Sequence, residues 1–257
     1  MEGESRFFYE TGIQKEVKHY SNGEADSLHL VYSENGILQE LHSYRHNRLD
    51  GIYQSFFSDG RLKGTGNYTE GIPEGNFLSY YMNGTIFTRV QFKSGHKEGV
   101  AFQYYDNGKV EIEAIYKSGQ LEGETKLFDK DGEITGIRPY ANDNLHGKSV
   151  DFFKGGALKE ITYYKFGKPD SLQVSYFPDG KTKAEIHYKV GKKDGAAIAY
   201  YDSGNIWTNQ NFIKGKLEGE SKIFRKNGTL WFGDFYENSK LIRSEEYSET
   251  GQIINKK

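Results

Sequence analysis

Apolar residues and glycines recur along the chain with a period of 24 residues. The most regular column has glycine in every repeat: Gly12, Gly36, Gly60, Gly84, Gly108, Gly132, Gly156, Gly180, Gly204 and Gly228. Two looser columns include Gly51 and Gly75 in one, with Ser27 and Ser171 in register, and Gly71 in the other. Because a fixed period of this length is typical of repeat architectures, we predict one array of ten repeats over residues 3–242. A partial repeat and C-terminal tail are expected over 243–257.

Two aromatic columns run through the same ten repeats. The first is Phe8, Tyr32, Phe56, Tyr80, Tyr104, Phe128, Phe152, Tyr176, Tyr200 and Phe224. The second is Tyr20, Tyr44, Tyr68, Phe92, Tyr116, Tyr140, Tyr164, Tyr188, Phe212 and Tyr236. An aliphatic column accompanies them: Leu38, Leu62, Ile86, Val110, Ile134, Leu158, Ile206 and Leu230.

Glycine turns recur every 11 to 13 residues, a spacing too short for ordinary helices. Each repeat is therefore predicted to form two short strands and two turns. The predicted fold class is all-β, an elongated single-sheet array of tandem β-hairpins that is twisted and curved. About twenty strands spaced by about 4.8 Å would extend for about 95 Å.

We predict the turn geometry from the loop length that keeps the apolar columns on one face of the sheet. A three-residue loop, Asp106-Asn107-Gly108, with the glycine in the left-handed region would place Tyr104 opposite Val110. The same loop at Lys117-Ser118-Gly119 would place Tyr116 opposite Gln120. With two such loops, both aromatic columns are expected on one face of the sheet.

Composition agrees with strands joined by glycine turns, since 20 Tyr, 17 Phe and 31 Gly accompany only 4 Pro. The formal net charge of -2 gives no overall attraction to nucleic acid or acidic lipid, so neither nucleic acid nor a membrane is an expected partner. The absence of Cys excludes disulfides and thiolate chemistry. No targeting or transmembrane segment is evident in the sequence. A cytoplasmic location is slightly favoured, and removal of a leader stays open.

Residues with catalytic or metal-binding chemistry are sparse. His42 and His46 have a helical metal-ligand spacing, but this stretch crosses from a strand into a turn, so two exposed imidazoles are the favoured interpretation. No nucleophile elbow, phosphate loop or dinucleotide fingerprint is present. We therefore predict a non-enzymatic protein without metal or cofactor.

Carboxylates recur immediately before one glycine column in eight of the ten repeats. They are Asp26, Asp50, Glu74, Glu98, Glu122, Asp170, Asp194 and Glu218. Cations, among them Arg48, His96 and Lys168, occur two positions earlier. Because a catalytic group would not be repeated so often, pairing of opposite charges on one face is favoured, and a ladder of ligand carboxylates is the alternative.

Irregularly placed aromatic residues are better candidates for recognition than the regular columns, because the repeat does not need them. The predicted partner-binding residues are Tyr81, Phe87, Tyr105, Phe153, Phe177, Tyr201, Trp207 and Trp231. A second packing layer is the structural alternative for this set. For Trp207 and Trp231 the alternatives are to flank a partner group, or to pack with Tyr201 and Phe235 and seal the end of the array.

Units such as Tyr104-Tyr105-Asp106-Asn107-Gly108-Lys109, together with the segment Tyr116 to Gly123, resemble MORN repeats. They are most similar to the bacterial variant found in proteins labelled YwqK-type antitoxins. The resemblance implies an extended sheet of β-hairpins used for protein interaction.

The function expected from these features is that of a monomeric scaffold that binds a protein partner by rigid display of an aromatic face. The family resemblance adds the expectation of an antitoxin-like or immunity partner of an effector. A carbohydrate-binding or cell-surface adhesive module is the alternative, because tyrosine and tryptophan platforms also stack on sugar rings.

Overall fold

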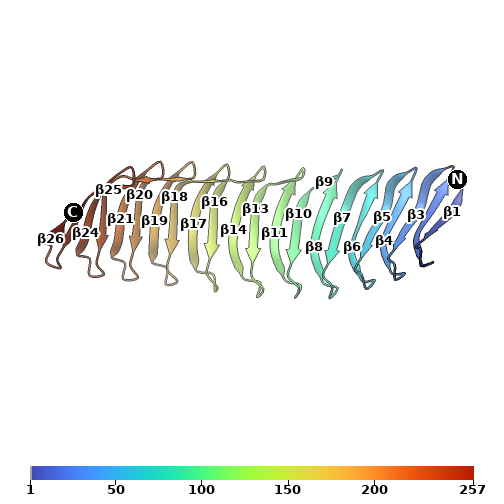
Figure 1. Cartoon of the computed structure of the whole chain (residues 1–257), viewed down its shortest axis with the longest axis horizontal. Helices are drawn as coiled ribbons and strands as arrows, with labels where there is room; N and C mark the ends of the chain where they lie inside the picture. The colour runs from blue at the N-terminus through green and yellow to red at the C-terminus, as the bar shows by residue number, and fades with distance from the viewer. Residues whose placement is uncertain (1) are drawn as a thin grey trace. The chain divides into compact units, whose positions relative to one another are not determined.

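The computed structural model describes residues 2–257, and Met1 lies outside the described residues. All helical or strand structure in that range is β-strand, so residues 2–257 include no helix that could cross a membrane. The chain divides into two compact units, Met1–Gly132 and Glu133–Lys257. In each unit the strands follow one another in chain order as antiparallel hairpins (Figure 1). The prediction of an all-β chain of tandem hairpins is confirmed.

The strands of the first unit are β1 (Gly3–Phe8), β2 (Gln14–Ser21), β3 (Glu24–Tyr32), β4 (Leu38–Arg45), β5 (Arg48–Phe56), β6 (Leu62–Thr69), β7 (Ile72–Tyr80), β8 (Ile86–Lys93), β9 (His96–Lys97), β10 (Gly99–Tyr104), β11 (Val110–Lys117), β12 (Gln120–Leu121) and β13 (Gly123–Phe128). Those of the second unit are β14 (Ile134–Ala141), β15 (Asn144–Leu145), β16 (Gly147–Phe152), β17 (Leu158–Lys165), β18 (Lys168–Tyr176), β19 (Thr182–Lys189), β20 (Lys192–Tyr200), β21 (Ile206–Ile213), β22 (Lys216–Leu217), β23 (Gly219–Phe224), β24 (Leu230–Glu237), β25 (Lys240–Tyr247) and β26 (Ile253–Lys256).

The three-residue turn predicted at Asp106-Asn107-Gly108 is confirmed. Tyr104 lies opposite Val110, and Gly108 has a φ of 83°. The Gly108 N–H donates to the Tyr105 carbonyl at 2.9 Å, as a type I turn requires. The glycine column is present in every repeat because each copy of this turn ends in a left-handed residue.

The second turn of the repeat differs from the prediction. Lys117 pairs with Gln120 and Tyr116 with Leu121, so the loop has two residues and not three. Both loop residues have positive φ, 50° at Ser118 and 88° at Gly119, which is the type I′ geometry. This turn matches the twist of the flanking strands, and that match outweighs the side-chain alternation on which the prediction was based.

The two aromatic columns lie on opposite faces of the sheet, so the prediction of a shared face is wrong. The pair Tyr104 and Val110 is followed by Gln103 and Ile112, which leaves Glu111 as the extra residue of a β-bulge. Farther along the hairpin, Ala101 lies opposite Ala114 and shares its face. Tyr116 is two residues from Ala114, whereas Tyr104 is three residues from Ala101. Alternation along a strand therefore places the two tyrosines on different faces.

The core is a thin layer of small side chains covered by rings. Among residues 2–257, the buried residues with a side chain are Val17, Ala101, Ala114, Ala197, Thr125, Ser149, Thr162 and Ser221, and Gly64, Gly66 and Gly136 are buried too. In the first unit, rings stack over one face from Tyr53 to Tyr68, Phe77 and Phe92, with centroids 6.1, 5.5 and 4.8 Å apart in turn. Contacts between rings on neighbouring strands thus replace the core that a single-layer sheet lacks.

In at least five repeats the repeated carboxylate joins a type I′ turn to the repeat before it. Glu98 accepts the Ser118 N–H at 2.7 Å, and the Gly119 N–H donates to the Lys97 carbonyl at 2.9 Å. The equivalent bonds of Glu74, Asp170 and Glu218 reach Ser94, Val190 and Asn238 at 2.7, 2.9 and 2.7 Å. These acids satisfy turn N–H groups that point away from their own hairpin.

The predicted pairing of these acids with a cation two positions earlier is wrong for Asp50. Arg48 lies 4.0 Å from Glu70, and the cation beside Asp50 is Arg45, also at 4.0 Å. For acids such as Glu98 that do bond a turn N–H, this group is the better partner because the turn fixes it, whereas an exposed ion pair must immobilise a long side chain.

Candidate interaction surface

The predicted partner-binding residues that follow the first aromatic column lie at the base of the three-residue turns. The Tyr105 N–H donates to the Lys109 carbonyl at 2.8 Å, while the Tyr105 carbonyl accepts the Gly108 N–H. Phe153 and Phe177 make the same bonds, to Ala157 and Lys181 at 2.8 Å each. With both backbone groups bonded, the hairpin fixes the direction in which each ring leaves the backbone.

The tyrosines of this set also connect successive repeats. The Tyr81 hydroxyl donates to the Tyr104 carbonyl, that of Tyr105 to Phe128, and that of Tyr201 to Phe224, each at 2.8 Å. Desolvation raises the pKa of the Tyr81 and Tyr105 hydroxyls, and the Glu111 carboxylate adds to the shift. Their ring faces are available for contact, but their hydroxyls have a structural role.

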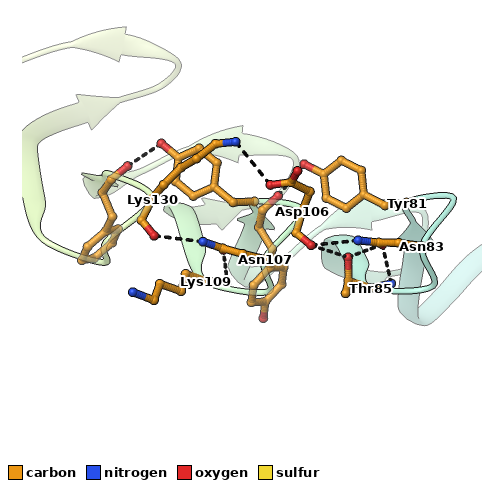
Figure 2. A network of polar contacts seen from close by, with 10 residues as sticks. Tyr81, Asn83, Thr85, Asp106, Asn107, Lys109 and Lys130 are labelled. Atoms are coloured by element: carbon orange, nitrogen blue, oxygen red, sulfur yellow. Dashed lines mark hydrogen bonds and ion pairs between the residues drawn. The ribbon is translucent and has the colours of Figure 1, made fainter.

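A network of polar side chains holds neighbouring three-residue turns together (Figure 2). Asn83 donates from Nδ2 to the Asp106 carbonyl at 2.9 Å, and Asn107 repeats the bond to Lys130 at 3.0 Å. Lys130 also forms an ion pair with Asp106 at 3.3 Å. Bonds from turn to turn limit the motion of this edge of the first unit, which favours rigid display of the rings beside it.

The structure brings two pairs of the predicted residues into contact. In the first unit, the rings of Tyr81 and Phe87 lie 4.9 Å apart at an interplanar angle of 61°. In the second unit, Tyr201 and Trp207 lie 6.0 Å apart at 40°. The rings of Tyr81 and Phe87 pack edge to face. In the second pair Trp207 is 48% exposed, so a large part of its indole surface is open to solvent.

An open cavity of about 370 Å³, which we call the aromatic hollow, lies beside the second pair. Its walls are Phe177, Tyr201 and Trp207, and Ala184 and Ala199, which lie opposite one another on β19 and β20, also line it. Three of the predicted residues therefore line one hollow whose surface is mainly apolar.

Charged groups stand beside the aromatic hollow. Lys183 and Lys226 line it, and Lys226 lies 5.9 Å from the centroid of the Tyr201 ring and 3.2 Å from Asp202. The ion pair lowers the pKa of the Asp202 carboxyl. The sequence pattern does not mark these charged residues or the two alanines as a site. The signal in the sequence that could have indicated the hollow is the presence of alanines on the strands next to the irregular aromatic residues.

The remaining predicted residues do not join the hollow. Trp231 lies 5.1 Å from Phe232 and 5.4 Å from the Arg225 guanidinium carbon, and it is 40% exposed. Its ring contact is thus with Phe232 and not with Phe235, the partner named in the end-sealing alternative, whereas Trp207 does contact Tyr201. Tyr105 lies beneath the Lys130 ammonium at 5.7 Å.

Of the two histidines with metal-ligand spacing, His46 is exposed as expected, whereas the expectation is wrong for His42, whose side chain is largely covered. His42 contacts the Tyr53 ring at 5.2 Å, whereas His46 lies in a type I′ turn and bonds Glu24 at 2.8 Å. Within residues 2–257, no group of three or more His, Cys, Asp or Glu is arranged to hold a metal ion.

The fold and the surface together define a β-hairpin repeat protein with aromatic side chains at the base of its three-residue turns. Three segments, 49–70, 97–118 and 169–189, match the family model described as MORN repeat variant. Each match covers one hairpin with a three-residue turn. No curated protein was found to match the chain.

Similarity to solved structures is weak. A crystal structure of TcdB2-TccC3 has a TM-score of 0.22 and 11% identity, over 98% of this chain and 17% of that chain. A Photorhabdus luminescens Tc holotoxin pore has a TM-score of 0.18 and 12% identity, over 97% of this chain and 18% of that chain. The chain spans less than a fifth of either length, and scores this low do not establish a shared fold.

Proposed function

We propose that the chain is a non-enzymatic protein-binding module whose aromatic hollow receives an apolar side chain of the partner. The observation that carries the proposal is the convergence of Phe177, Tyr201 and Trp207 around one open cavity. The matches to the MORN repeat variant support a binding module built from repeats. Buried aromatic anchors inside a polar rim are the usual source of binding energy at protein interfaces.

Trp207 is expected to contribute most to affinity. Covering its exposed half would remove about 100 Å² of apolar surface from water, worth about 2.5 kcal/mol. That energy corresponds to about a 60-fold change in Kd. The neighbouring Lys226 and Asp202 form the polar rim, and Trp231 extends the contact surface within the same unit.

The partner class that we favour is a proteinaceous effector, with the chain acting as its antitoxin-like or immunity partner. This part of the proposal is supported by the resemblance of the repeat units to those of YwqK-type antitoxins. A rigid set of rings suits such a role, because little side-chain entropy is lost when a preorganised surface binds.

Trp207→Ala tests the proposal. Proteins captured from a lysate of the source organism would be identified, purified and titrated against the wild type, Trp207→Ala and an exposed aromatic control on another strand, Tyr163→Ala. We expect Trp207→Ala to weaken binding by about 60-fold per folded molecule. Its melting temperature should fall modestly, because the covered half of the ring packs on Tyr201, so Kd is measured well below that temperature. Equal Kd values for all three proteins would contradict the proposed role of the hollow.

A carbohydrate-binding module is the second candidate, because the tilted rings of Tyr201 and Trp207 form two walls against which a sugar ring can stack. A glycan array separates the two functions. Glycan binding that Trp207→Ala abolishes, in the absence of any captured protein, would favour the carbohydrate function.

A further inference from the structure

The type I′ turns of two adjacent repeats carry apolar residues in a backbone conformation that does not suit them. Phe166 and Val190 are the first loop residues of their turns, and each has a φ of 50°. The same position in other repeats is occupied by Asn22, His46, Glu70, Ser94, Ser118, Asn142, Lys214 and Asn238. A left-handed conformation is unfavourable for a bulky residue and most unfavourable for a β-branched one such as Val190.

The Phe166 ring packs edge to face against His146, with centroids 5.3 Å apart, but most of the Phe166 and Val190 side chains stays exposed. The exposed fraction is 70% for Phe166 and 63% for Val190, the two largest values among the exposed large hydrophobic residues. An asparagine would suit both turns better and would remove apolar surface from water contact. Because backbone strain tends to occur at functional sites, two strained apolar residues that stay mostly exposed indicate a binding role.

A second cavity, which we call the turn hollow, lies beside both residues. Its volume is about 700 Å³, and Phe166, Val190 and Tyr188 form its apolar lining. Ser171, with a φ of 84° where most repeats have glycine, also lines it. Three residues in the left-handed region therefore surround one hollow in the second unit.

The charged groups of the turn hollow favour an anionic occupant. Lys165, Lys168 and Lys189 line it together with two carboxylates. Asp170 accepts the Val190 N–H at 2.9 Å, and the other carboxylate, Asp194, accepts the Lys214 N–H at 3.4 Å. The carboxylate oxygens thus bond the turns, and the three ammonium groups exceed the two carboxylates by one positive charge.

We propose that the turn hollow binds an acidic segment of a protein partner, with one apolar side chain of that segment inserted between Phe166 and Val190. Acidic residues on either side of the inserted side chain pair with Lys165, Lys168 and Lys189. This inference rests on the proposed function as a protein-binding module and assigns it a second contact site with stated partner chemistry. A hollow lined by two carboxylates suits a peptide better than a flat anionic membrane.

The first experiment selects peptides on the full chain from a phage-displayed library of random dodecapeptides. We expect selected peptides to carry acidic residues on both sides of an aromatic or aliphatic residue. Their Kd should rise at least about tenfold on the double variant Phe166→Asn/Val190→Asn, while its melting temperature stays equal or increases. Ser118→Asn, at the same turn position in the first unit, is the matched control and should bind as the wild type does.

The second experiment tests charge. Lys168→Glu/Lys189→Glu should weaken the selected peptides by at least about tenfold, and binding to the wild type should weaken as salt increases. Selected peptides without acidic residues, or peptides that bind the asparagine double variant within about twofold of the wild type, would overturn the proposal.

The same measurements separate this inference from the proposed function. Peptides that lose affinity on Trp207→Ala but not on the asparagine double variant would overturn the turn hollow and support the aromatic hollow. Sedimentation with phosphatidylcholine vesicles containing phosphatidylserine, if lost on the asparagine double variant and unaccompanied by acidic peptides, would identify a membrane contact and also overturn the proposal.

Discussion

At the scale of single residues, backbone conformation decides more of this sequence than burial does. Few side chains are buried, whereas a left-handed residue occurs at both loop positions of every type I′ turn and at the end of every three-residue turn. At Gly108 the conformational constraint is separate from any steric one, because an added Cβ there would meet no atom within 4 Å. The residue is constrained by its φ of 83° and not by space.

Gly108→Val is therefore expected to destabilise the protein through conformation alone. The left-handed region costs a non-glycine residue about 1 to 2 kcal/mol, and β-branching adds to the cost. Lys109→Val, one residue later at a strand-like position, should change stability by less than about 0.5 kcal/mol. Urea denaturation of both variants checks this, and equal midpoints would contradict the turn geometry.

Tyr105→Phe should remove the bond to the Phe128 carbonyl and lower stability by about 1 kcal/mol at neutral pH. The substitution should also change how the free energy of unfolding depends on pH in alkaline solution. The Tyr105 pKa is raised in the folded state, so its contribution is complete below the unfolded pKa of about 10 and is lost as the pH rises through the folded pKa.

Denaturation midpoints measured at neutral pH and above pH ~10 test both effects. The stability of Tyr105→Phe should fall less steeply with alkali than that of the wild type. Tyr163→Phe, at a 41% exposed tyrosine, is the control. A parallel fall for Tyr105→Phe and the wild type would show that the hydroxyl contributes no alkaline dependence.

At the scale of elements, the sequence predicted the hairpins but not the face on which each column lies. Gly108 and its equivalents identify the three-residue turn because only one backbone conformation explains an invariant glycine there. The bulge at Glu111 has no comparable sequence signal. Its extra residue is a glutamate, which any strand can contain, and it is left unpaired only because of the register between β10 and β11. One unrecognised bulge reverses the face of every residue beyond it, as happened for Tyr116.

The aromatic hollow was predictable only in part for a related reason. Phe177, Tyr201 and Trp207 are identifiable as irregular rings, but their convergence depends on which columns share a face. The sequence does not predict that Phe166 and Val190 are unusual. With a three-residue loop they would not need a positive φ, whereas the observed two-residue turn gives each a φ of 50°.

Glu98→Ala tests the link between each type I′ turn and the preceding repeat. Loss of the acceptor for the Ser118 N–H should cost about 1 kcal/mol and speed hydrogen exchange at that amide. Glu98→Gln keeps an acceptor oxygen and should retain most of the stability. Glu124→Ala, at an exposed acid two residues after the equivalent position of the next repeat, should have little effect. Unchanged exchange at Ser118 in Glu98→Ala would contradict the assigned bond.

At the scale of the whole molecule, stability is distributed among neighbouring hairpins and not concentrated in one core. Strands contact the strands before and after them, and buried positions are small. Stability in such arrays is approximately a sum of repeat and nearest-neighbour contributions. A local defect should consequently remain local.

Ala101→Leu provides the test within the first unit. Ala101 is 8% exposed and lies opposite Ala114, so a larger side chain should overpack this site and cost about 1 to 3 kcal/mol. Hydrogen exchange should accelerate most in β10 and β11 and progressively less toward β3. Uniform acceleration from β2 to β13 would instead show one cooperative core.

The hydrogen bonds between repeats have a direction that bears on how the chain folds while it is being made. At most type I′ turns, backbone N–H groups of the later repeat donate to acceptors of the earlier repeat, as Ser118 and Glu98 show. Two bonds run the other way, because the Ala25 and Leu217 N–H groups donate to Asn47 and Ser239 of the later repeat. A nascent chain appears in N-terminal to C-terminal order, so each new turn meets acceptors that have already been synthesised. Vectorial growth, one hairpin upon the last, would leave few strand edges exposed to other chains during translation.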